Sequence, residues 1–145
     1  MNWSEYDGKT RVALRIPGQT HMGHTPNVVR KGAFVTTARV FGSIPDPDKA
    51  PPMRDFPENP NVQCRQMFDN LVAQLNEVGA SLSDLVSVKI TYVGDGDEMR
   101  KYFKQVVDGI WDDLFPDRED QPVRSLDPGK LMYGTIACEV IAVVG

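Results

Sequence analysis

The sequence predicts an α+β domain in which two helices pack on one face of a β-sheet. Two long amphipathic segments alternate with segments rich in β-branched and aromatic residues, in the order strand, helix, strand, helix, strand. The chain has 145 residues, 41% of them hydrophobic and 25% charged, which is the composition of an ordinary globular protein and the size of one domain. We therefore expect a single domain over residues 1–145.

The first predicted strands lie between two loops rich in proline and glycine. Residues 17–32 contain two prolines and three glycines and are predicted to be loop, with a short strand at Asn27–Arg30. The run Ala33–Phe41 is rich in β-branched and aromatic residues, as is typical of a strand. Six prolines then predict a surface loop over residues 43–60, because proline lacks a backbone donor and disfavours helix in the residue before it.

The first long helix is predicted over residues 61–78, followed by a strand over residues 85–93. Gly79 provides a helix stop between the two elements. In the helix, apolar side chains recur every three or four residues and form a single stripe that would face the sheet. The residues of this stripe are Cys64, Phe68, Leu71, Leu75 and Val78.

A second helix is predicted to begin at Asp97, whose side chain would cap its first turn, and to end before Pro116. Its buried face would comprise Met99, Phe103, Val106, Ile110 and Leu114. An extended piece at Pro122–Ser125 and a turn at residues 127–130 then precede a final strand, Leu131–Val144. Both alternating faces of that strand are largely apolar. Because two helices cover only one face of a sheet, we expect self-association to cover the other.

Composition excludes several classes of function. The chain carries 16 Lys and Arg against 20 Asp and Glu, a net charge of −4, which disfavours nucleic-acid binding. The apolar runs are too short to span a membrane, and the start lacks a secretory leader, so a cytoplasmic protein is predicted. Cys64 and Cys138 have no metal-binding spacing, and His21 and His24 lack a third ligand, so no metal site is expected.

Two charged residues are candidates for chemistry. Glu139 lies in an apolar strand, where a carboxylate is either paired with a cation or tuned for acid–base work. Both interpretations stay open, and Arg39 or Lys89 would be the partner in an ion pair. Arg124 follows the stiffening Pro122, and a guanidinium on a rigid edge can bind a carboxylate through two hydrogen bonds. Taken alone, however, Arg124 is more simply interpreted as a surface arginine.

Two motifs in the C-terminal third of the chain stand out: Pro122-Val-Arg-Ser125 and Ala137-Cys-Glu-Val-Ile-Ala142. They resemble the Pro-Ala-Arg-Ser element and the Glu-Ile-Glu-Ala-Ile-Ala strand of the Rid/YjgF family (RidA, also called L-PSP endoribonuclease). The spacing of 15 residues from Arg124 to Glu139 also resembles that of the family. Weaker similarity in the first helix, the second strand and the Gly42-Ser-Ile-Pro45 turn extends the resemblance over residues 27–145.

This resemblance implies a chorismate-mutase-like fold, a mixed β-sheet with two helices packed on one face, assembled as a homotrimer with ligand clefts between subunits. It implies a hydrolase, specifically a deaminase that acts on small enamines and imines such as aminoacrylate, releases ammonia and a keto acid, and needs no cofactor. By position, Arg124 would bind the substrate carboxylate and Glu139 would position or activate water. Asp108, Ser125 and Gly42 fall at further substrate-binding positions.

The sequence also departs from the family pattern. Leu126 replaces a cysteine and Asp108 an asparagine, the turn around Gly42 is altered, and the N-terminal tyrosine has no clear counterpart, with Thr25 or Asn27 falling nearest. We therefore expect a diverged member with its own substrate. The alternative is a non-catalytic module of the same fold that binds a small carboxylate. The third possibility, an endoribonuclease, is disfavoured by the negative net charge.

Overall fold

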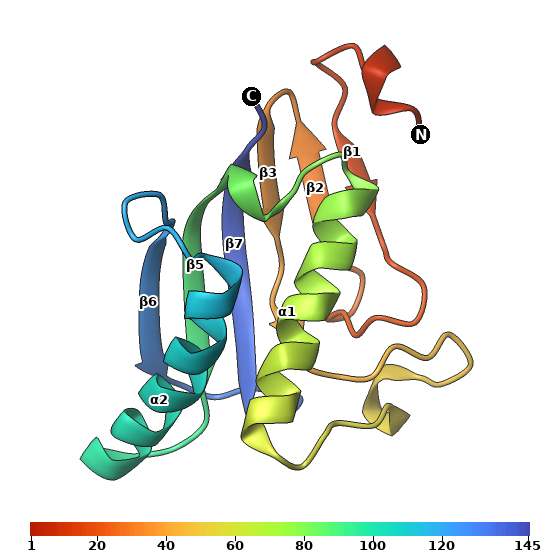
Figure 1. Ribbon diagram of the computed structural model, residues 1–145. Coiled ribbons are helices and arrows are strands. Elements are labelled where there is room, and N and C mark those ends of the chain that lie inside the picture. The colour runs from red at the N-terminus through yellow and green to blue at the C-terminus, as the bar shows by residue number, and fades with distance from the viewer.

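Strands β5 (Leu85–Tyr92) and β7 (Ile136–Val143) form the centre of a mixed sheet in the computed structural model, which describes residues 1–145 (Figure 1). The sheet has seven strands in the order β1-β2-β3-β7-β5-β6, and the short β4 pairs with β7. Only the pairing of β5 with β6 is parallel. The other strands are β1 (Val12–Leu14), β2 (Val28–Lys31), β3 (Phe34–Thr37), β4 (Val40–Phe41) and β6 (Val123–Pro128).

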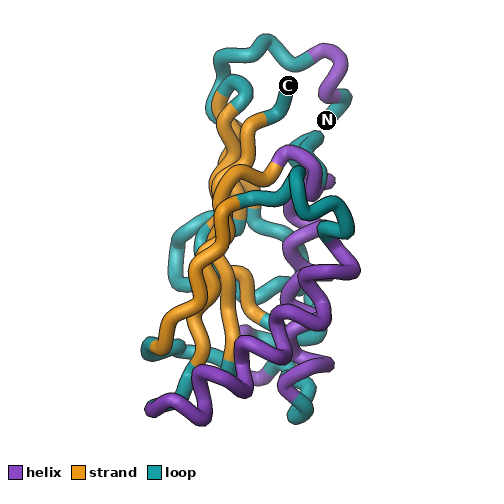
Figure 2. Tube along the Cα trace, turned by 60° about the vertical axis from the view of Figure 1, so that its left-hand side comes forward, coloured by secondary structure: helices purple, strands orange, loops and turns teal.

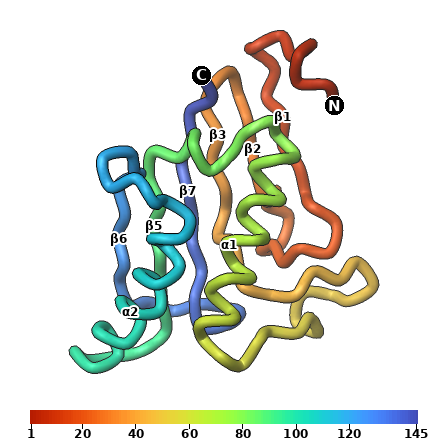
Figure 3. The backbone as a smooth tube through the Cα atoms, viewed as in Figure 1, coloured from red at the N-terminus to blue at the C-terminus, as the bar shows by residue number.

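Helices α1 (Pro60–Glu77) and α2 (Gly96–Leu114) lie on one face of this sheet, and the other face carries no helix (Figure 2). Three short 3-10 helices complete the fold: η1 (Trp3–Glu5) precedes β1, and η2 (Pro51–Met53) and η3 (Leu82–Asp84) lie in connections between longer elements. Both chain termini lie toward the same end of the molecule (Figure 3). None of the helices combines the length and apolar character that a membrane span needs. The predicted α+β class, with two helices on one face of a mixed sheet, is confirmed.

Helix α1 forms where the apolar stripe predicts it. The Asn59 side chain accepts hydrogen bonds from the backbone N–H groups of Asn61 and Val62, and Pro60 occupies the first turn. Gly79 follows the helix with a φ of +71°, a conformation that favours glycine. All five stripe residues are buried against the sheet.

Helix α2 differs from the prediction at its start and in its buried face. Asp95 is the residue that precedes the helix, and Asp97 lies in the first turn. Met99 is 37% exposed, whereas Val107 and Trp111 are buried beside Phe103, Val106 and Ile110. The physical reason is that the Trp111 ring packs against Phe68 of α1, so the side of α2 that carries Trp111 faces the interior.

The final strand begins at Ile136, five residues later than predicted. The Gln63 side chain on α1 accepts hydrogen bonds from the N–H and hydroxyl of Thr135, and Gly134 takes a φ of +69°. These contacts hold the preceding residues in a loop. The predicted strand Ala33–Phe41 is likewise split into β3 and β4 at Ala38 and Arg39, and the short β1 was not predicted.

The helix-free face of the sheet, called the open face below, is partly apolar. Phe34 is 48% exposed and its Cα partner Val143 49%, while Ile141 beside them is 40% exposed. The even-numbered residues of β7, from Ile136 to Ala142, are instead buried beneath the helices. The outward apolar face of β7 is therefore shorter than the sequence indicated, because residues 131–135 are not strand.

Candidate functional site

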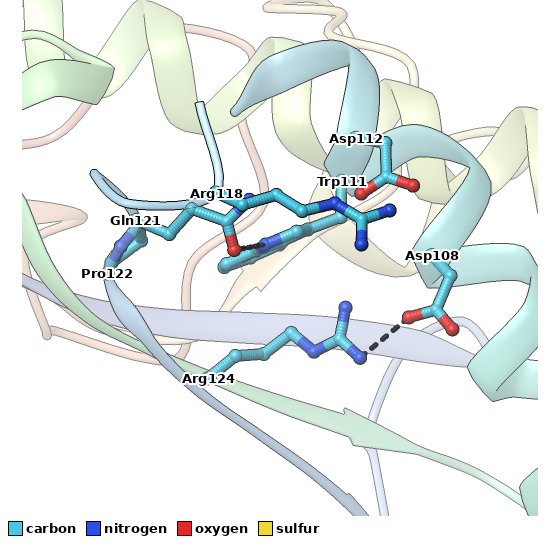
Figure 4. Close-up of a pocket in the computed structure, with 7 residues that line it drawn as sticks. All are labelled: Asp108, Trp111, Asp112, Arg118, Gln121, Pro122 and Arg124. Atoms are coloured by element: carbon cyan, nitrogen blue, oxygen red, sulfur yellow. Dashed lines mark hydrogen bonds and ion pairs between the residues drawn. The ribbon is translucent and has the colours of Figure 1, made fainter. Parts of the chain in front are cut away.

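A cavity of about 480 Å³ lies at the sheet edge, between β6 and the C-terminal half of α2 (Figure 4). We call it the edge cavity. Its lining is mostly polar and includes two arginines, two aspartates and one tryptophan. The lining residues are Asp108, Trp111, Asp112, Arg118, Gln121, Pro122 and Arg124.

The parallel pairing of β6 with β5 directs Arg124 into this cavity. Arg124 is the Cα partner of Val88, whose side chain is fully buried beneath the helices, so the guanidinium also points to the helix side. Its Nη2 donates to Asp108 Oδ1 at 2.7 Å, and its Cζ lies 5.1 Å from the centre of the Trp111 ring. No protein acceptor is bound to Nε or Nη1, so these N–H groups can donate to a ligand.

Asp108 connects Arg124 to a second cation. Its Oδ2 accepts a hydrogen bond from Lys104 Nζ at 2.6 Å, one turn earlier on α2. Burial raises the pKa of this carboxyl, but the hydrogen bonds and charges of Lys104 and Arg124 lower it by more, and the pKa is below its usual value. Asp108 is therefore an ionised partner that holds one edge of the Arg124 guanidinium in place.

The remaining wall of the cavity is a turn between α2 and β6. Trp111 Nε1 donates to Gln121 Oε1 at 3.3 Å, and Gln121 Nε2 donates to the Phe115 carbonyl at 2.8 Å. Arg118 projects from this turn. The sequence did not indicate Trp111, Gln121 or Arg118 as residues of the site. The ion pair between Lys104 and Asp108 could have been predicted, because residues four positions apart on a helix lie side by side.

Glu139 lies on the open face, away from the edge cavity. Its Cα partner is Lys89, and Lys89 Nζ lies 3.8 Å from Glu139 Oε1, with side-chain exposures of 59% and 37%. Arg39 instead donates to the Lys130 carbonyl. Of the two ion-pair partners considered from the sequence, the structure selects Lys89. The pair borders a hollow of about 210 Å³ that is also lined by Thr36, Thr37, Ser87, Val140 and Ile141.

The two other predicted binding positions are not in the edge cavity. Ser125 pairs with Lys89 in register and is exposed on the open face. Gly42 is buried against α1, where an added Cβ would lie 2.4 Å from the Gln63 carbonyl oxygen, so close packing accounts for a glycine there. The structure thus brings together Arg124 and Asp108, separately aligns Glu139 with Ser125, and leaves Gly42 in the interior.

The cysteines and histidines form no further site. Cys64 and Cys138 are free and buried, and burial raises the pKa of both thiols, that of Cys64 to about 12. His21 Nδ1 lies 3.0 Å from the Gly23 carbonyl oxygen in an exposed turn. No group of three or more His, Cys, Asp and Glu side chains is placed to hold a metal ion.

Several solved structures share this fold. The Rid-family protein YyfA from Yersinia pestis, of unknown function, aligns with a TM-score of 0.73 and 20% identity over 93% of this chain and 100% of that chain. Yeast Mmf1 aligns with a TM-score of 0.74 and 19% identity over 94% and 100%. A candidate endoribonuclease from Thermotoga maritima aligns with a TM-score of 0.72 and 23% identity over 89% and 93%.

Sequence comparison adds nothing to this likeness. No protein-family model matches the chain, and no curated protein matches it. The chain has the fold of the Rid proteins, so the resemblance first seen in its C-terminal motifs is confirmed in the arrangement of its sheet and helices.

Proposed function

We propose that this chain is a diverged Rid/YjgF protein that hydrolyses a small carboxylate-bearing enamine or imine, releasing ammonia and a keto acid. The observation that carries the proposal is the position of the Arg124 guanidinium and its free hydrogen-bond donors. The guanidinium lies in a cavity at the sheet edge, is held by Asp108 through one N–H, and keeps further N–H groups for a ligand. A planar guanidinium with free donors is suited to bind a carboxylate.

The proposed reaction needs only modest catalysis, because the substrate is reactive in water. The enamine tautomerises to an imine, water adds to the C=N carbon, and the resulting carbinolamine expels ammonia to leave the keto acid. Arg124 would hold the carboxylate, and the carboxylate of Glu139 would take a proton from the attacking water and pass it to the nitrogen that leaves as ammonia. General acid–base assistance of this kind contributes about 10²–10⁴-fold, which is enough for an intrinsically reactive substrate.

The proposed mechanism requires more than one subunit. The sheet separates Arg124 from Glu139 within one chain, so the two can meet only if Arg124 of one subunit faces Glu139 of a neighbour. We propose a homotrimer with clefts between subunits. The exposed apolar cluster Phe34, Ile141 and Val143 on the open face supports self-association, because contiguous apolar surface of this kind is commonly covered by a partner.

A second candidate function is a binding module that takes a small carboxylate without turning it over. The same separation of Arg124 from Glu139 favours it, since a monomer would keep the edge cavity but no Glu139 beside it. Such a module would need Arg124 and would be indifferent to Glu139.

Ammonia release distinguishes the two functions. Aminoacrylate is generated in the cuvette by a separate enzyme, and the rate of ammonia appearance is compared with and without the protein. We expect acceleration by the wild type and loss of acceleration in Arg124→Lys and Glu139→Gln. Binding of α-ketobutyrate without any acceleration of imine hydrolysis would favour the module and reject the deaminase.

A further inference from the structure

We infer that the edge cavity binds a ligand with two carboxylates, one held by Arg124 and the second by Arg118. The inference rests on the proposed function, because it takes the edge cavity with Arg124 as the substrate site. The substrate class would then be the imine of a short dicarboxylic acid. The two arginines come from different elements, β6 and the turn after α2, and both project into the same cavity (Figure 4).

Arg118 has no anionic partner of its own. It takes part in none of the five ion pairs and donates no hydrogen bond through its side chain. Asp112 lines the same cavity and also forms no ion pair, so the two residues are not in direct contact with each other. An arginine directed toward a cavity that already contains the anion-binding Arg124 is suited to a second anionic group.

The turn that carries Arg118 is held at both ends. Gln121 joins the Trp111 indole to the Phe115 carbonyl, and within the turn the Asp117 side chain accepts from the Glu119 N–H at 2.9 Å. The backbone of Arg118 is therefore kept at a defined place beside the cavity. A ligand that binds Arg118 would therefore have to order its side chain but not the backbone of the turn.

The cavity offers little apolar surface to a ligand. Trp111 is the one aromatic residue of the lining, but it is only 4% exposed, and the Arg124 Cζ lies over its ring at 5.1 Å from the ring centre. A ligand here would therefore be held by its charged ends, with a short carbon chain between them. The local charges are also favourable: Lys104, Arg118 and Arg124 outnumber Asp108 and Asp112, and Asp108 is already bound by Lys104 and Arg124.

Binding of stable product analogues tests the inference without relying on turnover. Isothermal titration calorimetry compares α-ketoglutarate, with two carboxylates, and α-ketobutyrate, with one. We expect the wild type to bind α-ketoglutarate about 10-fold more tightly, as one additional charged hydrogen-bonded contact provides. In Arg118→Gln this preference should fall to about 2-fold or less. The control Arg11→Gln makes the same charge change at an exposed residue next to β1, at the opposite edge of the sheet, and should keep the preference.

Asp112→Asn provides an independent test, because it should strengthen the binding of α-ketoglutarate where Arg118→Gln weakens it. Removing a carboxylate from the cavity should raise the affinity for α-ketoglutarate by about 3-fold, because one like charge no longer repels the dianion. Equal binding of both acids by the wild type, or an unchanged preference in Arg118→Gln, would overturn the inference. If Arg124→Lys weakens both acids while Arg118→Gln weakens neither, the proposed carboxylate site stands and only the second subsite is wrong. If the wild type binds neither acid, both proposals fail.

Discussion

Across strand β5, Arg124 is aligned with Val140 rather than with Glu139, and this difference of one residue puts the two side chains on opposite faces of the sheet. Arg124 therefore shares the helix side with Asp108, and Glu139 shares the open face with Lys89. The two predicted catalytic residues, Arg124 and Glu139, therefore do not contact each other within one chain, and each is paired with a different residue. The proposed chemistry consequently depends on assembly, which makes the oligomeric state the first property to measure.

The wild type is expected to be a trimer at micromolar concentration by light scattering. Val143→Asp should dissociate it, because the new charge would be buried without a partner on the open face. Val62→Asp is the matched control: Val62 is 53% exposed on the first turn of α1, compared with 49% for Val143. A monomeric wild type would contradict the trimer and with it the site between subunits.

Arg124→Lys should weaken binding of α-ketobutyrate by about 1.5–3 kcal/mol, because lysine keeps the charge but lacks the planar set of donors. Calorimetric titration measures the loss, and the thermal unfolding temperature checks that the fold survives. Arg65→Lys changes an exposed arginine whose pair with Asp113 lies outside the edge cavity, and should bind the acid as the wild type does. Unaltered affinity in Arg124→Lys would make Arg124 an ordinary surface arginine.

Glu139→Gln should lower imine turnover by about 100-fold while leaving the fold intact. The ion pair with Lys89 is half-exposed, so its loss should cost only ~0–1 kcal/mol of unfolding free energy rather than the larger penalty of a buried pair. Lys89→Gln breaks the same pair and is the control for a purely structural effect. Equal turnover in Glu139→Gln and the wild type would remove Glu139 from the mechanism.

Asp108→Asn should change how stability depends on pH. The pKa of Asp108 is lower in the folded chain than its usual value of 3.8, so its ionised form stabilises the fold above that pH. This contribution is lost as the pH falls through the lowered pKa. Urea unfolding should therefore show a gap between wild type and Asp108→Asn at neutral pH that closes in acid. Asp112→Asn, one turn further along α2 and without an ion pair, should show a much smaller change with pH.

The two thiols should be inert in the native protein. Cys64 and Cys138 are at most 1% exposed, and burial raises the pKa of each thiol, so neither forms the reactive thiolate at neutral pH. A chromogenic disulfide reagent should react with both cysteines in denaturant and with neither under native conditions. Rapid reaction of the folded protein would show that the interface between α1 and β7 opens.

The sequence by itself determined the fold class, the two long helices and the strand between them. The apolar stripe from Cys64 to Val78 needs only the periodicity of a helix, and the strand at residues 85–92 only its β-branched composition, so both could be placed from local patterns. The Arg124 and Glu139 motifs were visible for the same reason, since they are short and contiguous. The choice of Rid fold followed from them and is borne out by the solved structures.

The tertiary structure alone decided how these residues are combined. Which face each strand residue occupies depends on the pairing register across β5, and a shift of one residue would exchange the faces. The selection of Lys89 over Arg39, the contact of Arg124 with Asp108, and the start of β7 at Ile136 all depend on partners distant in the chain. Such contacts leave no periodic signal in the sequence, because the side chains that meet are positioned by the packing of separate elements.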